Sequence, residues 1–166
     1  MGSELLLRRK WTLRAHHRQV VFIKKPNEHA HHVLMKAFLW ALYLPDYPDL
    51  QVETAIGDRY KPDVVALDRL DPYAEPRFWG EAGQVSLEKI HSLLRRYRQT
   101  HFAIAKWATN LNPLIETITT SVQSFKRTAP IDLLTFPVDS AERFIDARGE
   151  IHISHADLVW TSIGGR

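Results

Sequence analysis

Apolar residues recur along the chain with two spacings, one typical of strands and one typical of helices. Short alternating or β-branched runs between turn residues predict strands, whereas stripes repeating about every 3.6 residues predict helices. The predicted strands are 4–13, 19–23, 50–54, 60–67, 77–83, 101–108, 131–136, 150–154 and 158–162. The predicted helices are 27–43, 86–97 and 112–125, with a single helical turn at 139–144. The first two strands and the last two strands are each expected to form a hairpin.

The order of these elements predicts an α/β fold, with a mixed sheet and helices on its faces. The strand, helix and strand within residues 78–105 form a βαβ unit, which requires a parallel strand pair joined by a right-handed crossover. The helix over 27–43 carries so wide an apolar stripe that we expect it to be buried on most sides. No internal repeat or low-complexity linker divides the chain, so residues 1–166 are expected to form a single domain.

Composition narrows the class of protein. With 45% hydrophobic and 25% charged residues, the 166-residue chain suits one globular core. The absence of cysteine excludes disulfides and thiolate zinc ligands, and it fits a reducing cytoplasm. The longest apolar run, residues 33–44, contains Lys36 and ends at Pro45, so it is too short to span a membrane. Basic residues follow the first apolar run, unlike in a signal peptide, and we expect a cytoplasmic protein with no membrane partner.

The net charge of +3 is small, but the charges are unevenly distributed. Basic residues concentrate in residues 8–25 and again in 89–98, while acidic residues concentrate in 46–71. Basic flanks hold phosphates and an acidic cleft holds cations, so this distribution permits nucleic-acid binding. Many soluble proteins without a nucleic-acid role have a similar distribution.

The candidate functional residues lie mainly in residues 57–89, which are predicted to form two strands followed by a helix. Asp63 lies at the start of an otherwise apolar strand, and Glu81 lies at the end of the next one. If the two strands are neighbours, their carboxylates meet at one edge of the sheet. Paired carboxylates need a metal ion, a proton or a cationic side chain between them.

This order of parts resembles the PD-(D/E)xK nuclease superfamily. A Pro-Asp pair at Asp63 is followed eighteen positions later by Glu81 and then by a basic helix. The nearer resemblance is to the YaeQ-like proteins, which carry a Glu-x-Gly strand end before that helix, here Glu81 to Gly83 followed by Lys89. The likeness covers residues 18–107 in order of elements, and the fold that it implies is the restriction-endonuclease-like core.

The resemblance implies a Mg²⁺ site, with Mn²⁺ as a substitute metal. In the superfamily the Asp and the Glu bind the metal and the next peptide oxygen adds a ligand, so these roles fall on Asp63, Glu81 and the backbone of Ala82. Hard oxygen ligands at an open site suit Mg²⁺. Glu28 matches a position where many members place another acid, although acids are also routine at the start of a helix.

The lysine of the superfamily motif is missing from its usual position, which is Gly83 in this chain. Side chains alternate along a strand, so we expect residue 83 to face the site and to contribute nothing. Three residues could replace the lysine: Gln84, Lys106 on the next strand, and Lys89 on the following helix. We favour Lys89 because some branches of the superfamily moved their lysine to this helix, but a solvated helix face would explain it equally well.

These features support two main functional hypotheses. The first is a Mg²⁺-dependent nuclease that hydrolyses DNA or RNA, with DNA the more expected partner, and that could act as a homodimer. The second, favoured by Gly83, is a degenerate nuclease fold that binds nucleic acid or protein without cleavage. A small α/β protein with no nucleic-acid role is a third hypothesis. His29 and His32, three residues apart, could share a zinc ion, but no third ligand is evident and a polar helix start also explains them.

Overall fold

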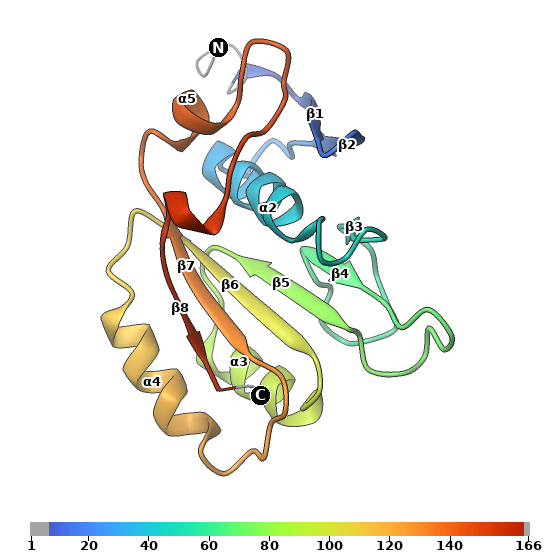
Figure 1. The fold of residues 1–166 in the computed structure, drawn as a ribbon, viewed down its shortest axis with the longest axis vertical. Helices are drawn as coiled ribbons and strands as arrows, with labels where there is room; N and C mark the ends of the chain where they lie inside the picture. The colour runs from blue at the N-terminus through green and yellow to red at the C-terminus, as the bar shows by residue number, and fades with distance from the viewer. Residues whose placement is uncertain (1–6, 165–166) are drawn as a thin grey trace.

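A computed structural model describes residues 7–164 (Figure 1). The strands are β1 (Lys10–Ala15), β2 (Arg18–Ile23), β3 (Gln51–Val52), β4 (Val64–Ala66), β5 (Phe78–Ala82), β6 (His101–Trp107), β7 (Ile131–Phe136) and β8 (Val159–Ile163). The helices are α2 (Ala30–Tyr43), α3 (Leu87–Arg96), α4 (Asn112–Val122), α5 (Ser140–Phe144) and a 3₁₀ turn at His155–Asp157.

Six strands form the central sheet in the order β3-β4-β5-β6-β7-β8. β5, β6 and β7 run parallel, and β3, β4 and β8 pair antiparallel at the two sides. The predicted βαβ unit is confirmed, because α3 connects the parallel strands β5 and β6. β1 and β2 form the predicted separate hairpin, which turns at His16 and His17, both in left-handed conformation.

Each face of the sheet carries its own hydrophobic core. One core joins α2, the β1–β2 hairpin and α5 to side chains such as Phe78 and Leu134. The other joins α3 and α4 to alternate side chains of the same strands, such as Trp79 and Leu133. The strands are therefore covered on both faces, which explains why their sequences are nearly continuously apolar. The described chain forms one mixed α/β domain, as predicted.

Helix α2 is buried on nearly all sides, as its wide apolar stripe predicts. Every residue from Val33 to Leu44 is buried. The helix begins later than expected, at Ala30, because Asn27 and Glu28 lie in a turn and His29 takes the N-cap position without a side-chain hydrogen bond. Within residues 7–164, no helix combines the length and the apolar character required to cross a membrane.

The predicted C-terminal hairpin is wrong. Residues 150–154 form only isolated bridges, from Glu150 to Arg14 and from Ile151 to Ile145. β8 instead pairs antiparallel with β7, because the edge of β7 offers unpaired backbone groups. Of the first predicted strand, residues 4–6 lie outside the described part of the chain, and the observed strand runs from Lys10 to Ala15.

Candidate active site

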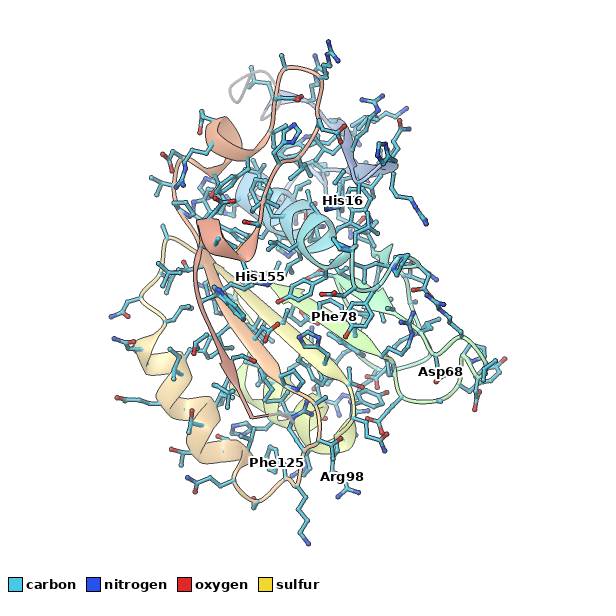
Figure 2. The ribbon with its side chains drawn as sticks, in the orientation of Figure 1. His16, Asp68, Phe78, Arg98, Phe125 and His155 are labelled. Atoms are coloured by element: carbon cyan, nitrogen blue, oxygen red, sulfur yellow. The ribbon has the colours of Figure 1, made fainter. Side chains whose placement is uncertain are left out.

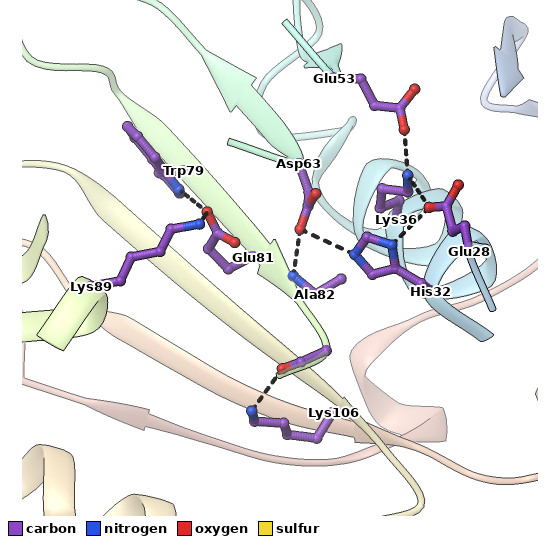
Figure 3. Close-up of polar contacts among 11 residues, drawn as sticks. Glu28, His32, Lys36, Glu53, Asp63, Trp79, Glu81, Ala82, Lys89 and Lys106 are labelled. Carbon is purple, nitrogen blue, oxygen red and sulfur yellow. Dashed lines mark hydrogen bonds and ion pairs between the residues drawn. The ribbon is translucent and has the colours of Figure 1, made fainter. Parts of the chain in front are cut away.

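Asp63 and Glu81 lie next to each other where β4 begins and β5 ends. Val64 pairs with Gly80 in the antiparallel register, which brings the residue before β4 opposite the end of β5. The Asp63 carboxylate accepts a hydrogen bond from the Ala82 amide at 2.8 Å (Figure 3). Burial raises the pKa of Glu81, and the negative charge of Asp63 raises it further. β4 and β5 are therefore neighbours, and the negative charge of Asp63 disfavours the ionised form of Glu81.

Lys89 reaches Glu81 from helix α3. The Ser86 hydroxyl accepts from the Lys89 amide at 3.1 Å and caps the helix, which sets the first turn of α3 beside β5. The Lys89 ammonium lies 3.0 Å from Oε1 of Glu81, and the same oxygen accepts from the Trp79 indole at 2.8 Å. Two donors thus hold an almost fully buried carboxylate in one orientation (Figure 3).

Gly83 does not face the Glu81 side, contrary to the strand-alternation argument. It lies just beyond β5 with a φ of +85°, a left-handed conformation that favours glycine. A Cβ at this position would meet His32 at 3.5 Å and Met35 at 3.6 Å, both on α2. A lysine placed here would therefore point across the end of the strand, toward α2.

The other two predicted substitutes for the lysine lie apart from the carboxylate pair. Lys106 lies on β6, the neighbour of β5, and its ammonium donates to the Gly83 carbonyl at 2.7 Å. Burial lowers the pKa of Lys106. Gln84 is exposed and lines the same cavity as Lys106. Of the three substitutes, Lys89 is the one that contacts a site carboxylate within the described residues.

A charged network on α2 joins the site, and sequence reasoning did not find it. His32 lies between two carboxylates, 2.7 Å from Glu28 and 3.7 Å from Asp63. Lys36, whose side chain is only 3% exposed, donates to Glu28 at 2.7 Å and also to Glu53. Glu53 has a left-handed φ of +53°, and its amide donates to the Asp63 carbonyl. The available signal was the spacing of Glu28, His32 and Lys36, which repeats every four residues.

The ionisation of this network follows from its contacts. Burial raises the pKa of Glu28, but hydrogen bonds from Lys36, the Lys25 amide and His32 outweigh it and lower the pKa to about 2. The Asp63 carboxylate raises the pKa of His32. Burial lowers the pKa of Lys36, but its two carboxylate partners outweigh this and raise it. The network therefore pairs the Lys36 ammonium with two carboxylates, and His32 is the member that contacts Asp63.

The donor set at this position fits Mg²⁺. Two carboxylates that repel each other gain from a cation between them, and Mg²⁺ commonly takes one or two carboxylates while keeping several waters. Within residues 7–164, no three His, Asp or Glu side chains gather as a fuller set of metal ligands. Glu28 belongs to the network around Lys36, and His32 contacts carboxylates, so the zinc hypothesis gains no third ligand.

Comparison with known proteins identifies the fold. No protein-family model and no curated protein sequence matches the chain. The YaeQ protein of Pseudomonas syringae has a similar structure, with a TM-score of 0.59 and 14% identity over 83% of this chain and 75% of that one. The YaeQ protein of Xanthomonas axonopodis pv. citri matches with a TM-score of 0.55 and 12% identity over 95% of this chain and 98% of that one. The chain therefore has a YaeQ-like fold.

Proposed function

We propose that this protein is a Mg²⁺-dependent nuclease with a restriction-endonuclease-like core of the PD-(D/E)xK type. The observation that carries the proposal is the trio of Asp63, Glu81 and Lys89. Two repelling carboxylates lie at the end of β5, and an ammonium lies 3.0 Å from one of them. A carboxyl pKa that is raised by burial and by a neighbouring charge is typical of a functional site.

Asp63, Glu81 and the backbone of Ala82 would hold the metal. Bound Mg²⁺ would supply Lewis-acid polarisation of the phosphodiester and a more acidic water. Trp79 fixes the orientation of Glu81, and the Ala82 amide fixes that of Asp63. Lys89, which is half-buried, would balance the negative charge of the phosphate oxygens, and a partly desolvated ammonium does this more strongly than one in bulk water.

The chain also offers cations for the phosphate backbone, although fewer than the sequence suggests. Arg95 and Arg98 are exposed beside α3. Arg96 is occupied, because its guanidinium forms an ion pair with Asp58 at 2.7 Å. Backbone contacts of this kind position a nucleic acid without reading its sequence.

Calorimetry with Mg²⁺ and a cleavage assay on labelled DNA test the proposal. We expect wild type to bind Mg²⁺ and to cleave, and we expect Asp63→Asn and Glu81→Gln to lose both. Lys89→Met should keep metal binding and lose cleavage by roughly 100-fold or more, the usual effect of removing one charge-stabilising donor. Glu142→Gln, an exposed acid on α5, and Lys126→Met, an exposed lysine, serve as matched controls. Cleavage that survives Glu81→Gln would reject this site.

A second function, binding without cleavage, has its own supporting observation. The Lys89 ammonium lies 3.0 Å from Glu81 and offsets part of its negative charge, so the site is partly satisfied without a metal. A protein that retains DNA at low salt but neither binds Mg²⁺ nor cleaves would establish this alternative.

A further inference from the structure

A cavity of about 580 Å³ opens beside the carboxylate pair, between the start of α2 and the ends of β5 and β6. Its volume is within the range of roughly 300–1,000 Å³ that is usual for small-molecule sites. Ala82 and His32 connect the cavity to the carboxylate pair, since both residues line the cavity and contact Asp63. A group bound in the cavity would therefore lie directly next to the proposed reaction centre.

One wall of the cavity is aromatic. The rings of His31 and Trp107 are stacked, with centroids 4.5 Å apart and planes inclined by 13°. His31 is exposed, while Trp107 is half-buried and packs against the core under α2. An exposed ring on a fixed aromatic base is a platform on which a nucleobase can stack, since every base has a π-face.

The cavity also contains an ammonium with spare donors. Lys106 donates to the Gly83 carbonyl at 2.7 Å, and no carboxylate lies within ion-pair distance of it in residues 7–164. An ammonium has three donors, so two remain for a ligand. The carboxylate that lines the cavity, Glu28, is engaged by the Lys25 amide, His32 and Lys36. The ligand that complements this cavity is therefore aromatic and anionic.

From this cavity we infer that the protein binds one unpaired nucleotide, with its base on the His31–Trp107 stack and its phosphate on Lys106. The substrate is then a single strand or an unpaired end, because a base inside a duplex presents neither of its faces. The inference rests on the proposed nuclease function, since it names the substrate class of the same site.

Fluorescence anisotropy in EDTA tests this inference without cleavage. The probes are a labelled single-stranded DNA of eight nucleotides and a blunt hairpin duplex of equal charge. We expect the single strand to bind at least tenfold more tightly. His31→Ala should weaken single-strand binding roughly fivefold or more, as the loss of one base stack does, and should leave duplex binding unchanged. Lys106→Gln should weaken single-strand binding and reduce its salt dependence by about one phosphate contact.

Matched controls separate the cavity from general effects. Tyr73→Ala removes an exposed aromatic ring of the 68–76 loop, and Lys126→Gln removes an exposed lysine; both should leave the affinities unchanged. His31 is exposed, so its removal leaves the fold intact, and circular dichroism checks this.

The outcomes distinguish the two proposals. The cavity assignment would be overturned if the protein bound both probes with equal affinity. It would also be overturned if folded His31→Ala and Lys106→Gln bound the single strand as tightly as wild type. Either result would hold even if the protein cleaves DNA. Strong single-strand binding that both variants weaken, by a protein that never cleaves with Mg²⁺, would keep the cavity and reject the nuclease.

Discussion

Two buried carboxylates lie on different strands of the sheet, and their surroundings differ, because α3 reaches one of them and α2 reaches the other. Glu81 ends β5 and Asp132 is the second residue of β7, and each side chain is only 7% exposed. Asp132 accepts hydrogen bonds from Tyr43 at 2.7 Å and from His101 at 2.7 Å, and Tyr47 contacts the other ring nitrogen of His101. This second cluster lies among aromatic rings, including Phe78 and His155 (Figure 2).

Equal burial produces opposite pKa shifts. Burial raises the pKa of Asp132, but its hydrogen bonds from His101 and Tyr43 outweigh this and lower it. Burial also raises the pKa of Glu81, and there the charge of Asp63 adds to it, so the donors Trp79 and Lys89 do not compensate. The Asp132 cluster is therefore a satisfied structural network, whereas the two donors at Glu81 do not fully offset burial and the charge of Asp63.

The largest expected effect comes from breaking the satisfied network. Asp132→Ala should lower the free energy of unfolding by about 3 kcal/mol, because it leaves His101 and Tyr43 without their buried acceptor. Urea denaturation measures the change. Asp139→Ala, at an exposed acid 59% accessible in its side chain, should change stability by less than about 0.5 kcal/mol. If both variants lowered the free energy of unfolding equally, Asp132 would not stabilise the fold more than an exposed acid does.

Mg²⁺ should stabilise the folded protein through Asp63 and Glu81 and not through the Asp132 cluster. At a concentration of one hundred times its Kd, Mg²⁺ should raise the free energy of unfolding by about 2.7 kcal/mol in wild type. Thermal unfolding with and without Mg²⁺ measures this shift. Asp63→Asn should lose the shift, while Asp139→Asn should keep it. A shift of the same size in Asp63→Asn would place the metal elsewhere.

Removing the repelled charge should make the protein more stable. Glu81→Gln keeps the shape of the side chain and ends its repulsion with Asp63, so we expect a gain of about 1 kcal/mol at neutral pH, at the expense of activity. Urea denaturation at pH 7 is the measurement. The matching change in the Asp132 cluster, Asp132→Asn, should destabilise the protein. If both variants lost stability, the proposed difference between the Glu81 site and the Asp132 cluster would be wrong.

The pH dependence of these two variants should differ in sign. Because its folded pKa is raised, the Glu81 carboxyl favours the folded state most below its unfolded pKa, near 4.5, and this contribution is lost as pH rises through the folded pKa. The gain from Glu81→Gln should therefore shrink toward zero as pH falls to 4.5. The folded pKa of Asp132 is lowered, so the loss from Asp132→Asn should be constant above its unfolded pKa, near 3.8, and shrink only at lower pH. Unfolding curves between pH 3 and 8 compare the two.

Helices and strands were predicted at the right place where a proline or a capping residue marks their ends in the sequence. β7 occupies residues 131–136 as predicted, between a proline at each side, and α3 begins after its Ser86 cap. The sequence predicted that Asp63 and Glu81 meet only if their two strands are neighbours, and the pairing of β4 with β5 fulfils that condition. The start of α2 was misplaced, because Asn27 is a plausible cap in the sequence but the helix takes His29 as its N-cap.

The sequence by itself determined the α/β class and the βαβ crossover, since periodicity and connection length are properties of the local chain. The meeting of Asp63 and Glu81 also required the pairing of β4 with β5. The tertiary structure alone decided the pairing of β8 with β7, because strand partners depend on which edge is open in space. It also decided the left-handed turn at Gly83 and the contact of Lys36 with Glu53, seventeen residues away. Such contacts depend on how helices and strands pack, and the pattern of any single segment does not contain that information.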